Sequence, residues 1–272
     1  MSGKLYLVAT TIGNLEDITI RAINTLIQVD IIAAEDTRHT LKLLNHLDIS
    51  KPLISYHRHN EEIKSEELID KLLNGKNIAV VTDAGTPGIS DPGEEIVKEA
   101  IKKNIEIVPI PGACAAINAL IISGLSTKEF VFLGFLPLNK KLRNKKLEEI
   151  KKETKTIVIY EAPHKLKTTL EDLKNIIESR QVIMVKELTK MHEKIIRGNI
   201  DEILQECDNP RGEYIILLEG AKQEKEENKL NNLSLEEHYK YYEQEGLSKK
   251  EIIKKIAKDR NVDKNEIYMK FI

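Results

Sequence analysis

The densest group of residues able to hold a small molecule spans residues 82–93, which read Thr-Asp-Ala-Gly-Thr-Pro-Gly-Ile-Ser-Asp-Pro-Gly. Glycines let the backbone approach a ligand closely, and prolines stiffen the loop. Asp83 and Asp91 offer carboxylate acceptors for hydroxyls or an amine. A tight connection with Asx caps is the alternative interpretation, but the length and glycine content of the segment favour a binding site.

Two more turns of small residues follow strand-like runs, at residues 8–15 and 109–116. Each alone could be an ordinary connection between a strand and a helix. The carboxyl ends of parallel strands share one edge of a sheet, where open α/β sheets bind their ligands. The three turns together therefore predict one ligand cleft. No Gly-x-Gly-x-x-Gly and no phosphate-loop motif occurs, so nicotinamide and ATP chemistry lack their usual sequence support.

Residues 34–39 place Glu35, Asp36, Arg38 and His39 at the end of another predicted strand. A helix cap would explain Asp36 or Thr37, but it explains neither Arg38 nor His39. We expect this segment to carry chemistry or to contact a polar substrate.

The segment at 55–61 adds Tyr56, His57 and Arg58. Its His-x-His pattern is a weak sign of a metal site, and no third ligand stands out, so no metal is expected. Aromatic rings and arginine are the side chains that grip unpaired RNA. The alternatives are an RNA-contacting surface and a solvated turn, and the composition favours the first.

These segments need elements to position them, and the first half of the chain alternates short strands with amphipathic helices. This rhythm predicts a doubly wound α/β domain with a mostly parallel sheet over residues 1–124. A second α/β domain is expected over 125–220, with its last two strands, at 192–197 and 214–218, running antiparallel. Residues 221–233 have no periodicity and are expected to form a linker. Residues 234–272 have helical spacing.

The composition is that of a globular protein, since 41% of the 272 residues are hydrophobic and 32% are charged. The formal net charge of −2 argues against a heavily basic nucleic-acid binder, but it leaves room for a local basic patch. Two cysteines cannot build a disulfide framework. The start runs directly into a strand, and no apolar stretch approaches the roughly 20 residues of a membrane span. We expect a soluble, cytoplasmic protein.

Several motifs occur together in one order along residues 4–220. They include Ile-Gly-Asn-Leu, Ala-Glu-Asp-Thr-Arg, Asp-Ala-Gly-Thr-Pro, Ile-Ser-Asp-Pro-Gly and Glu-Ala-Pro-His-Lys-Leu. In this the chain resembles the ribosomal RNA small subunit methyltransferase I family, cytidine 2′-O-methyltransferases within the tetrapyrrole methylase superfamily. Two positions depart from the family pattern: Thr11 stands where proline is common, and Cys114 replaces another small residue. Both substitutions are compact, so they bear on the rigidity of the cleft.

The resemblance implies a class III S-adenosylmethionine (SAM) methyltransferase fold, with the cofactor folded between two α/β domains, usually in a homodimer. It implies a cytidine ribose in the decoding region of small-subunit (16S) RNA, or of the 30S particle, as the substrate. The cofactor-binding residues carried over by their positions are Ile12, Asp83, Gly85, Thr86, Cys114, Ala115 and Ala162.

The implied reaction is an in-line displacement in which alignment can supply much of the acceleration. A base would help to remove the proton of the ribose hydroxyl. Glu35, Asp36, His39 and His57 are candidates, and the position of Glu35 at a strand end favours it. Arg38 and Arg58 suit phosphate groups, and the reaction requires no metal.

Two basic segments could extend the RNA contact. One is a predicted helix with Lys140, Lys141, Arg143, Lys145 and Lys146, for which a solvated face is the alternative. The other is the tail, which resembles a helix-turn-helix and could be an RNA-docking element or a small packing module. Two competing functions also remain: a methylase of a tetrapyrrole or another small molecule, and a non-catalytic RNA-binding assembly factor.

Overall fold

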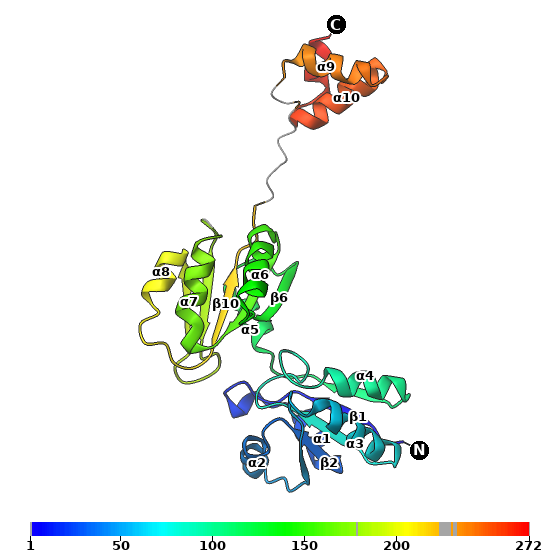
Figure 1. Cartoon of the computed structure of the whole chain (residues 1–272), viewed down its shortest axis with the longest axis vertical. Coiled ribbons are helices and arrows are strands. Elements are labelled where there is room, and N and C mark those ends of the chain that lie inside the picture. Colours follow the sequence, from blue (N-terminus) through cyan, green and yellow to red (C-terminus); the bar gives the residue numbers. More distant parts are fainter. Residues whose placement is uncertain (1, 178, 223–229, 231–232, 272) are drawn as a thin grey trace. The chain divides into compact units, whose positions relative to one another are not determined.

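The computed structural model describes residues 2–177, 179–222, 230 and 233–271. The chain divides into two compact units, Met1–Ala221 and Lys222–Ile272 (Figure 1). Residues 223–229, 231 and 232 of the expected linker lie outside the described residues. Among the described residues, no helix is long and apolar enough to cross a membrane.

The first sheet is entirely parallel, with the strand order β3-β2-β4-β1-β5. Its strands are β1 (Leu5–Val8), β2 (Ile31–Ala34), β3 (Leu53–Ser55), β4 (Ile78–Val81) and β5 (Ile107–Ile110). Order and direction agree with the predicted doubly wound domain.

Helices cover both faces of this sheet, because successive side chains of a strand point to opposite faces. Leu5 packs in the core with α3 (Glu61–Leu73) and α4 (Glu94–Lys102). Val8 packs in the opposite core with α1 (Ile20–Gln28) and α2 (Thr37–His46). A short 3₁₀ helix, η1 (Leu15–Asp17), leads into α1.

The second sheet is mixed, with the order β6-β7-β10-β8-β9. Its strands are β6 (Phe130–Phe135), β7 (Thr156–Glu161), β8 (Val182–Lys186), β9 (Lys194–Gly198) and β10 (Tyr214–Leu218). β6 and β7 are parallel, whereas β10 runs antiparallel to both β7 and β8.

The expected pairing of the last two strands is wrong, since β9 pairs with β8. All five residues of β10 are buried, while the side chains of β9 are partly or fully exposed. A strand that is apolar on both faces belongs in the middle of a sheet, and a half-polar strand belongs at its edge.

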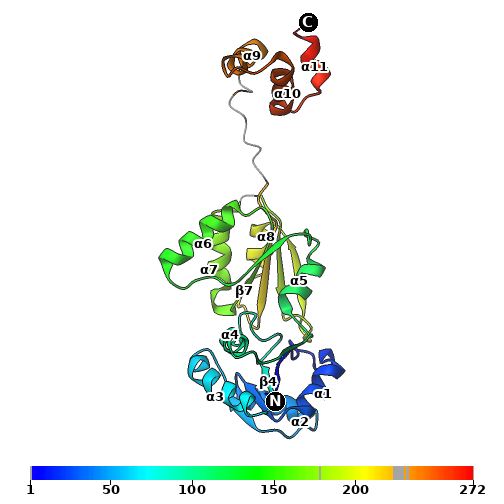
Figure 2. The ribbon, with the colours of Figure 1, turned by 90° about the vertical axis from the view of Figure 1, so that its right-hand side faces the viewer.

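Helices also cover both faces of the second sheet (Figure 2). One face carries α6 (Lys140–Lys152), α7 (Pro163–Lys174) and α8 (Ile200–Gln205). The other face carries α5 (Ala115–Ser123), which packs through Ala116, Ala119 and Leu120. The domain boundary at residues 124 and 125 remains our proposal; α5, although it precedes this boundary, covers the second sheet.

The C-terminal unit contains α9 (Leu235–Gln244), α10 (Lys249–Arg260) and α11 (Lys264–Met269). Ser234 and Ser248 begin α9 and α10 with capping boxes, in which Glu237 and Glu251 bond back to the cap. The three helices enclose a small core that includes Tyr242, Ile252, Ile256 and Ile267. The helical tail predicted from the spacing is confirmed.

Candidate functional site

The turns after β1 and β4 are joined by backbone hydrogen bonds. The N–H of Thr10 donates to the carbonyl of Gly85 at 2.8 Å, and the N–H of Gly85 donates to the carbonyl of Thr11 at 3.1 Å. Gly85 has a φ of +79°, and a Cβ there would lie 3.3 Å from Cγ2 of Ile12. Glycine is therefore required both by the backbone conformation and by the close approach.

The turn after β5 joins the same group. Thr86 Oγ1 donates to the carbonyl of Ala113 at 3.0 Å. A Cβ on Gly112 would lie only 2.8 Å from Cβ of Ala9. Because β4, β1 and β5 are neighbours in the sheet, the three small-residue turns meet at one edge, as the sequence predicts.

These turns form part of a pocket with a volume of about 380 Å³, which the ends of β7 and β10 complete from the second sheet. All of the residues expected to bind a cofactor line it, namely Ile12, Asp83, Gly85, Thr86, Cys114, Ala115 and Ala162. A pocket of this size lies in the range that holds small molecules. Its lining thus brings together segments up to 203 residues apart in sequence, from Ile12 to Ile215.

The loop after β8 also reaches the first turn. A Cβ on Gly13 would clash with the aliphatic part of the Lys190 side chain. Lys190 Nζ in turn contacts Glu213 Oε2 at 2.9 Å, and Glu213 lines the pocket. The loop after β8 therefore links the first turn to the pocket wall at Glu213.

Of the four candidate bases, Glu35, Asp36, His39 and His57, only Glu35 lines the pocket. Its Oε2 accepts a hydrogen bond from the backbone N–H of Asp83 at 3.4 Å. Burial raises the pKa of Glu35, the neighbouring Asp83 carboxylate adds to the rise, and the bond from Asp83 opposes it.

Asp36 and His39 take other positions. Asp36 caps α2 by accepting from the N–H of Arg38 at 2.8 Å, and the Arg38 guanidinium contacts its Oδ2 at 2.8 Å. Hydrogen bonds from Arg38 hold the pKa of Asp36 well below its ordinary value. His39 is an exposed residue of α2, and neither residue lines the pocket.

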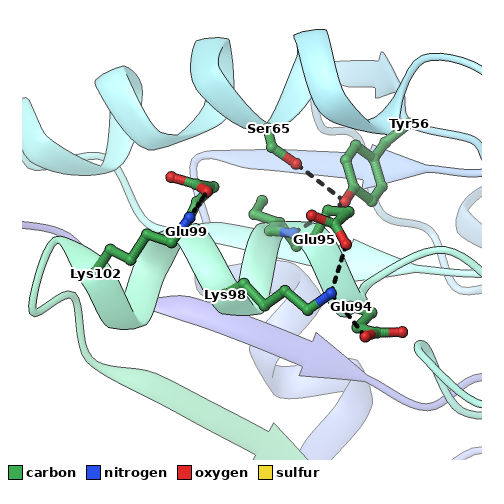
Figure 3. Close-up of polar contacts among 8 residues, drawn as sticks. Tyr56, Ser65, Glu94, Glu95, Lys98, Glu99 and Lys102 are labelled. Carbon is green, nitrogen blue, oxygen red and sulfur yellow. Dashed lines mark hydrogen bonds and ion pairs between the residues drawn. The ribbon is translucent and has the colours of Figure 1, made fainter.

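The expectation that Tyr56 stacks on RNA is wrong, because its side chain is 0% exposed. Figure 3 shows its hydroxyl directed at Ser65, with the two oxygens 3.2 Å apart. The backbone N–H of Ile96 also donates to the Tyr56 hydroxyl, at 3.3 Å. Tyr56 follows β3 directly, and its ring enters the core between α3 and α4, where its hydroxyl satisfies the start of α4.

The two residues after Tyr56 lie nearer the surface. His57 is half-buried, and Arg58 is exposed. Arg58 Nη2 donates to the carbonyl of Ser90 at 3.1 Å. The proposed RNA segment therefore abuts the loop that lines the pocket.

The basic side chains of helix α6 differ in whether they are paired or exposed. The Arg143 side chain is only 14% exposed, with Nε 2.7 Å from Asp172 Oδ2 and Nη2 2.8 Å from Thr169 Oγ1. Thr169 donates to Glu161, so Arg143 supports the pocket wall and is not free to bind phosphate. Lys146 pairs with Glu149, while Lys140, Lys141 and Lys145 are exposed.

Sequence reasoning missed several pocket residues that come from the second sheet. Glu161 and Tyr214 are paired across β7 and β10, and both line the pocket with Tyr160 and Glu213. Tyr160 accepts a hydrogen bond from the N–H of Ala116 at 2.9 Å, and burial raises its pKa. The available signal was the acidic residue beside a tyrosine at 160–161 and again at 213–214, but only the strand order brings these pairs together.

The pocket is acidic, because Glu35, Asp83, Asp91, Glu161 and Glu213 all line it. Its apolar contacts come from Ile12, Phe135 and Leu188, among others. Carboxylates beside an apolar wall suit a ligand that combines cationic groups with an aromatic or aliphatic body. In the part of the chain that the structure describes, no group of His, Cys, Asp and Glu could hold a metal ion.

Comparison with known proteins points to one group. The family model of tetrapyrrole (corrin/porphyrin) methylases matches residues 4–204. The ribosomal RNA small subunit methyltransferase I of Halalkalibacterium halodurans is 51% identical, over 98% of this chain and 93% of that protein. The protein of the same name from Bacillus subtilis is 49% identical, over 98% and 93%.

Solved structures share the fold at low sequence identity. The methyltransferase CobJ aligns with a TM-score of 0.63 and 17% identity, over 81% of this chain and 95% of that chain. Uroporphyrin-III C-methyltransferase from Thermus thermophilus, complexed with S-adenyl homocysteine, aligns with a TM-score of 0.58 and 16% identity, over 80% and 97%.

Proposed function

Because this chain belongs to the tetrapyrrole methylase family, and within it to the group of the ribosomal RNA small subunit methyltransferases I, we propose that it methylates a cytidine ribose 2′-hydroxyl in the decoding region of small-subunit ribosomal RNA. It is a methyltransferase and uses SAM as the methyl donor. The position of the methyl group and the nucleotide are the parts that we propose.

One observation carries the proposal: the residues expected to bind SAM, which come from four separate segments of the sequence, line one pocket. The lining fits the donor in its chemistry. SAM carries its methyl group on a positively charged sulfonium sulfur, which activates the methyl group for transfer. Gly85 has no side chain, and a Cβ at this position would lie 3.3 Å from Cγ2 of Ile12 and narrow the pocket. Carboxylates of the lining, Asp83 among them, provide partners for the positive charges of the donor.

The chain's own residues then align and shield the reaction. Ile12, on the first turn, and Ala162, at the start of α7, contribute to the two sides of the pocket. We assign the amino and carboxyl end of the donor to Asp83 and Thr86, and backbone contacts to Cys114 and Ala115. Small side chains at these last two positions leave their backbone accessible from the pocket.

We further propose that RNA approaches over Arg38, His57 and Arg58. The Arg38 side chain is 89% exposed, and Arg58 reaches the pocket loop through Ser90. Planar guanidinium groups bind phosphate through two hydrogen bonds. A small-molecule methylase has no need for this basic rim, which favours RNA as the substrate. A homodimer and a cytoplasmic location, where the small subunit is assembled, complete the proposal.

The test is methyl transfer from radiolabelled SAM to 30S particles and to naked RNA from a strain that lacks the gene. Nuclease digestion and mapping of the labelled nucleoside identify the product. We expect 2′-O-methylcytidine in the decoding region. Label in a nucleobase would contradict the reaction, and label only in small molecules would contradict the substrate.

A further inference from the structure

The carboxylates of the pocket differ in their protein partners. Glu35 accepts from the N–H of Asp83, Glu161 accepts from Thr169 and from the N–H of Ala162, and Glu213 pairs with Lys190. Asp83 accepts from a backbone N–H at the end of β2. Among the lining residues that the structure describes, Asp91 is the one carboxylate with no hydrogen bond or ion pair.

The loop holds Asp91 firmly although its carboxylate is unbonded. Directly before it, the carbonyl of Ser90 accepts from Arg58. Ser90 Oγ also lies so close to Gly134 of β6 that a Cβ there would be 2.9 Å away. Directly after Asp91, the carbonyl of Pro92 accepts from the N–H of Gly88 at 3.1 Å. Contacts from both sheets therefore hold the residue before Asp91, and a hydrogen bond within the loop holds the residue after it, while the carboxylate itself stays free.

The charges around Asp91 come from several elements. Glu35 at the end of β2, Asp83 after β4 and Glu213 before β10 disfavour its ionised form, while Arg58 favours it. Burial is the largest influence, and together these effects raise the pKa of Asp91 to about 7. A carboxylate whose proton affinity matches the working pH transfers protons most effectively.

Resting on the proposed function, we propose that Asp91 is the general base that takes the proton from the ribose 2′-hydroxyl. The hydroxyl oxygen forms a bond to the methyl carbon, and the O–H proton passes to the Asp91 carboxylate. The carbon–sulfur bond breaks, and its electron pair remains on sulfur as a neutral thioether. The proton leaves Asp91 to solvent after the product departs.

Glu35, which its position at a strand end favours as the base, has a different role in the structure. The Glu35 carboxylate is engaged by the Asp83 backbone, so it helps to hold the two strand ends together. Asp91 has both oxygens available for a substrate. Glu35 then acts as a positioning residue, and its negative charge helps to keep the proton affinity of Asp91 high.

The test compares the wild-type chain with Asp91→Asn, Asp91→Glu and Glu35→Gln. Single-turnover methyl transfer to 30S particles is measured from pH 5.5 to 9 with saturating SAM, whose affinity is measured separately by calorimetry. We expect the wild-type rate to rise about tenfold per pH unit below about 7 and then to level. Asp91→Asn should lose roughly 10²- to 10⁴-fold in rate and the rising limb with it, while its SAM affinity stays within about twofold of the wild type.

The other two variants separate chemistry from structure. Asp91→Glu keeps a carboxyl group, so its rate should still rise with pH, although the rate itself should be reduced. Glu35→Gln should also keep the rise of the rate with pH, whatever its absolute rate. An Asp91→Asn chain with the wild-type rate and profile, or a limb lost only in Glu35→Gln, would overturn the assignment. A wild type inactive on every RNA substrate would overturn the proposed function and Asp91 with it, whereas an active wild type with an unchanged Asp91→Asn would overturn only Asp91.

Discussion

The backbone N–H of Asp36, at the end of β2, donates a 3.0 Å hydrogen bond to Oδ1 of Asp83, at the end of β4. These strands are neighbours, so the bond ties together the two segments that sequence reasoning singled out for chemistry. One oxygen of Asp83 is thereby engaged. The side chain is oriented for a ligand contact through the other.

Replacing Asp83 by alanine should therefore weaken SAM binding by roughly 10- to 100-fold, since a hydrogen bond to a charged group contributes about 1.5–3 kcal/mol. Calorimetry measures the affinity, and circular dichroism checks the fold. Asp83→Asn is the matched control, because its amide oxygen can still accept from Asp36. Unchanged affinity in the alanine variant would show that the donor lies elsewhere.

The burial of Tyr56 leads to a prediction about stability. Tyr56→Phe removes the partner of Ser65 and of the Ile96 N–H, which should lower the free energy of unfolding by about 1–2 kcal/mol. Denaturant unfolding measures this loss. Affinity for small-subunit RNA should stay the same, and a marked drop in a folded variant would restore Tyr56 as an RNA contact.

These residues show what sequence alone could predict. The parallel sheet, its helices and the convergence of three turns followed from hydrophobic periodicity and from glycine and proline positions, because these signals are local. The inward turn of Tyr56 was missed because a single aromatic residue at the end of a short strand gives no periodicity. Its neighbours His57 and Arg58 made the whole segment look exposed.

The second half of the pocket depends on contacts between distant segments. Tyr214 lies opposite Glu161 only because β10 inserts between β7 and β8. No local pattern records this order. Asp91 was visible as an acceptor in the loop, but its lack of a partner is a property of the folded pocket.

The basic rim predicts a dependence on salt. Arg38→Ala and Arg58→Ala should each weaken binding to the RNA substrate and reduce the slope of log affinity against log salt by about 0.7–0.9, the value for one lost phosphate contact. Filter binding over a range of salt concentrations measures both effects.

Lys102→Ala is the matched control for these two arginines. Lys102 is a surface residue at the end of α4 that pairs with Glu99 at 2.6 Å (Figure 3). The chain passes from there to the start of β5, at the edge of the sheet opposite the pocket. Its removal should change neither affinity nor slope, and equal effects in all three variants would argue against a localised RNA contact.

The environment of Asp91 also predicts how stability depends on pH. Its pKa rises from 3.8 to about 7 in the folded chain, so between these values the folded state holds a proton that the unfolded state has released. The contribution of Asp91 to the free energy of unfolding therefore falls as the pH rises through that window. Above the window, the full destabilising contribution remains.

Asp91→Asn removes this penalty. Because the group is half-buried and solvent screens part of its charge, we expect this penalty to be on the order of 1 kcal/mol. The Tm difference between variant and wild type should then become more favourable to the variant by roughly 2–4 °C between pH 4 and pH 8. Scanning calorimetry at both pH values gives the comparison. A difference that does not change with pH would contradict a raised proton affinity at Asp91.

The central claim is that one pocket, built from both sheets, holds the methyl donor. A crystal structure with S-adenosylhomocysteine tests it most directly. Density for the ligand against Ile12, Asp83, Cys114 and Ala162 is the predicted result. Density for the ligand at any other place on the chain would contradict the account.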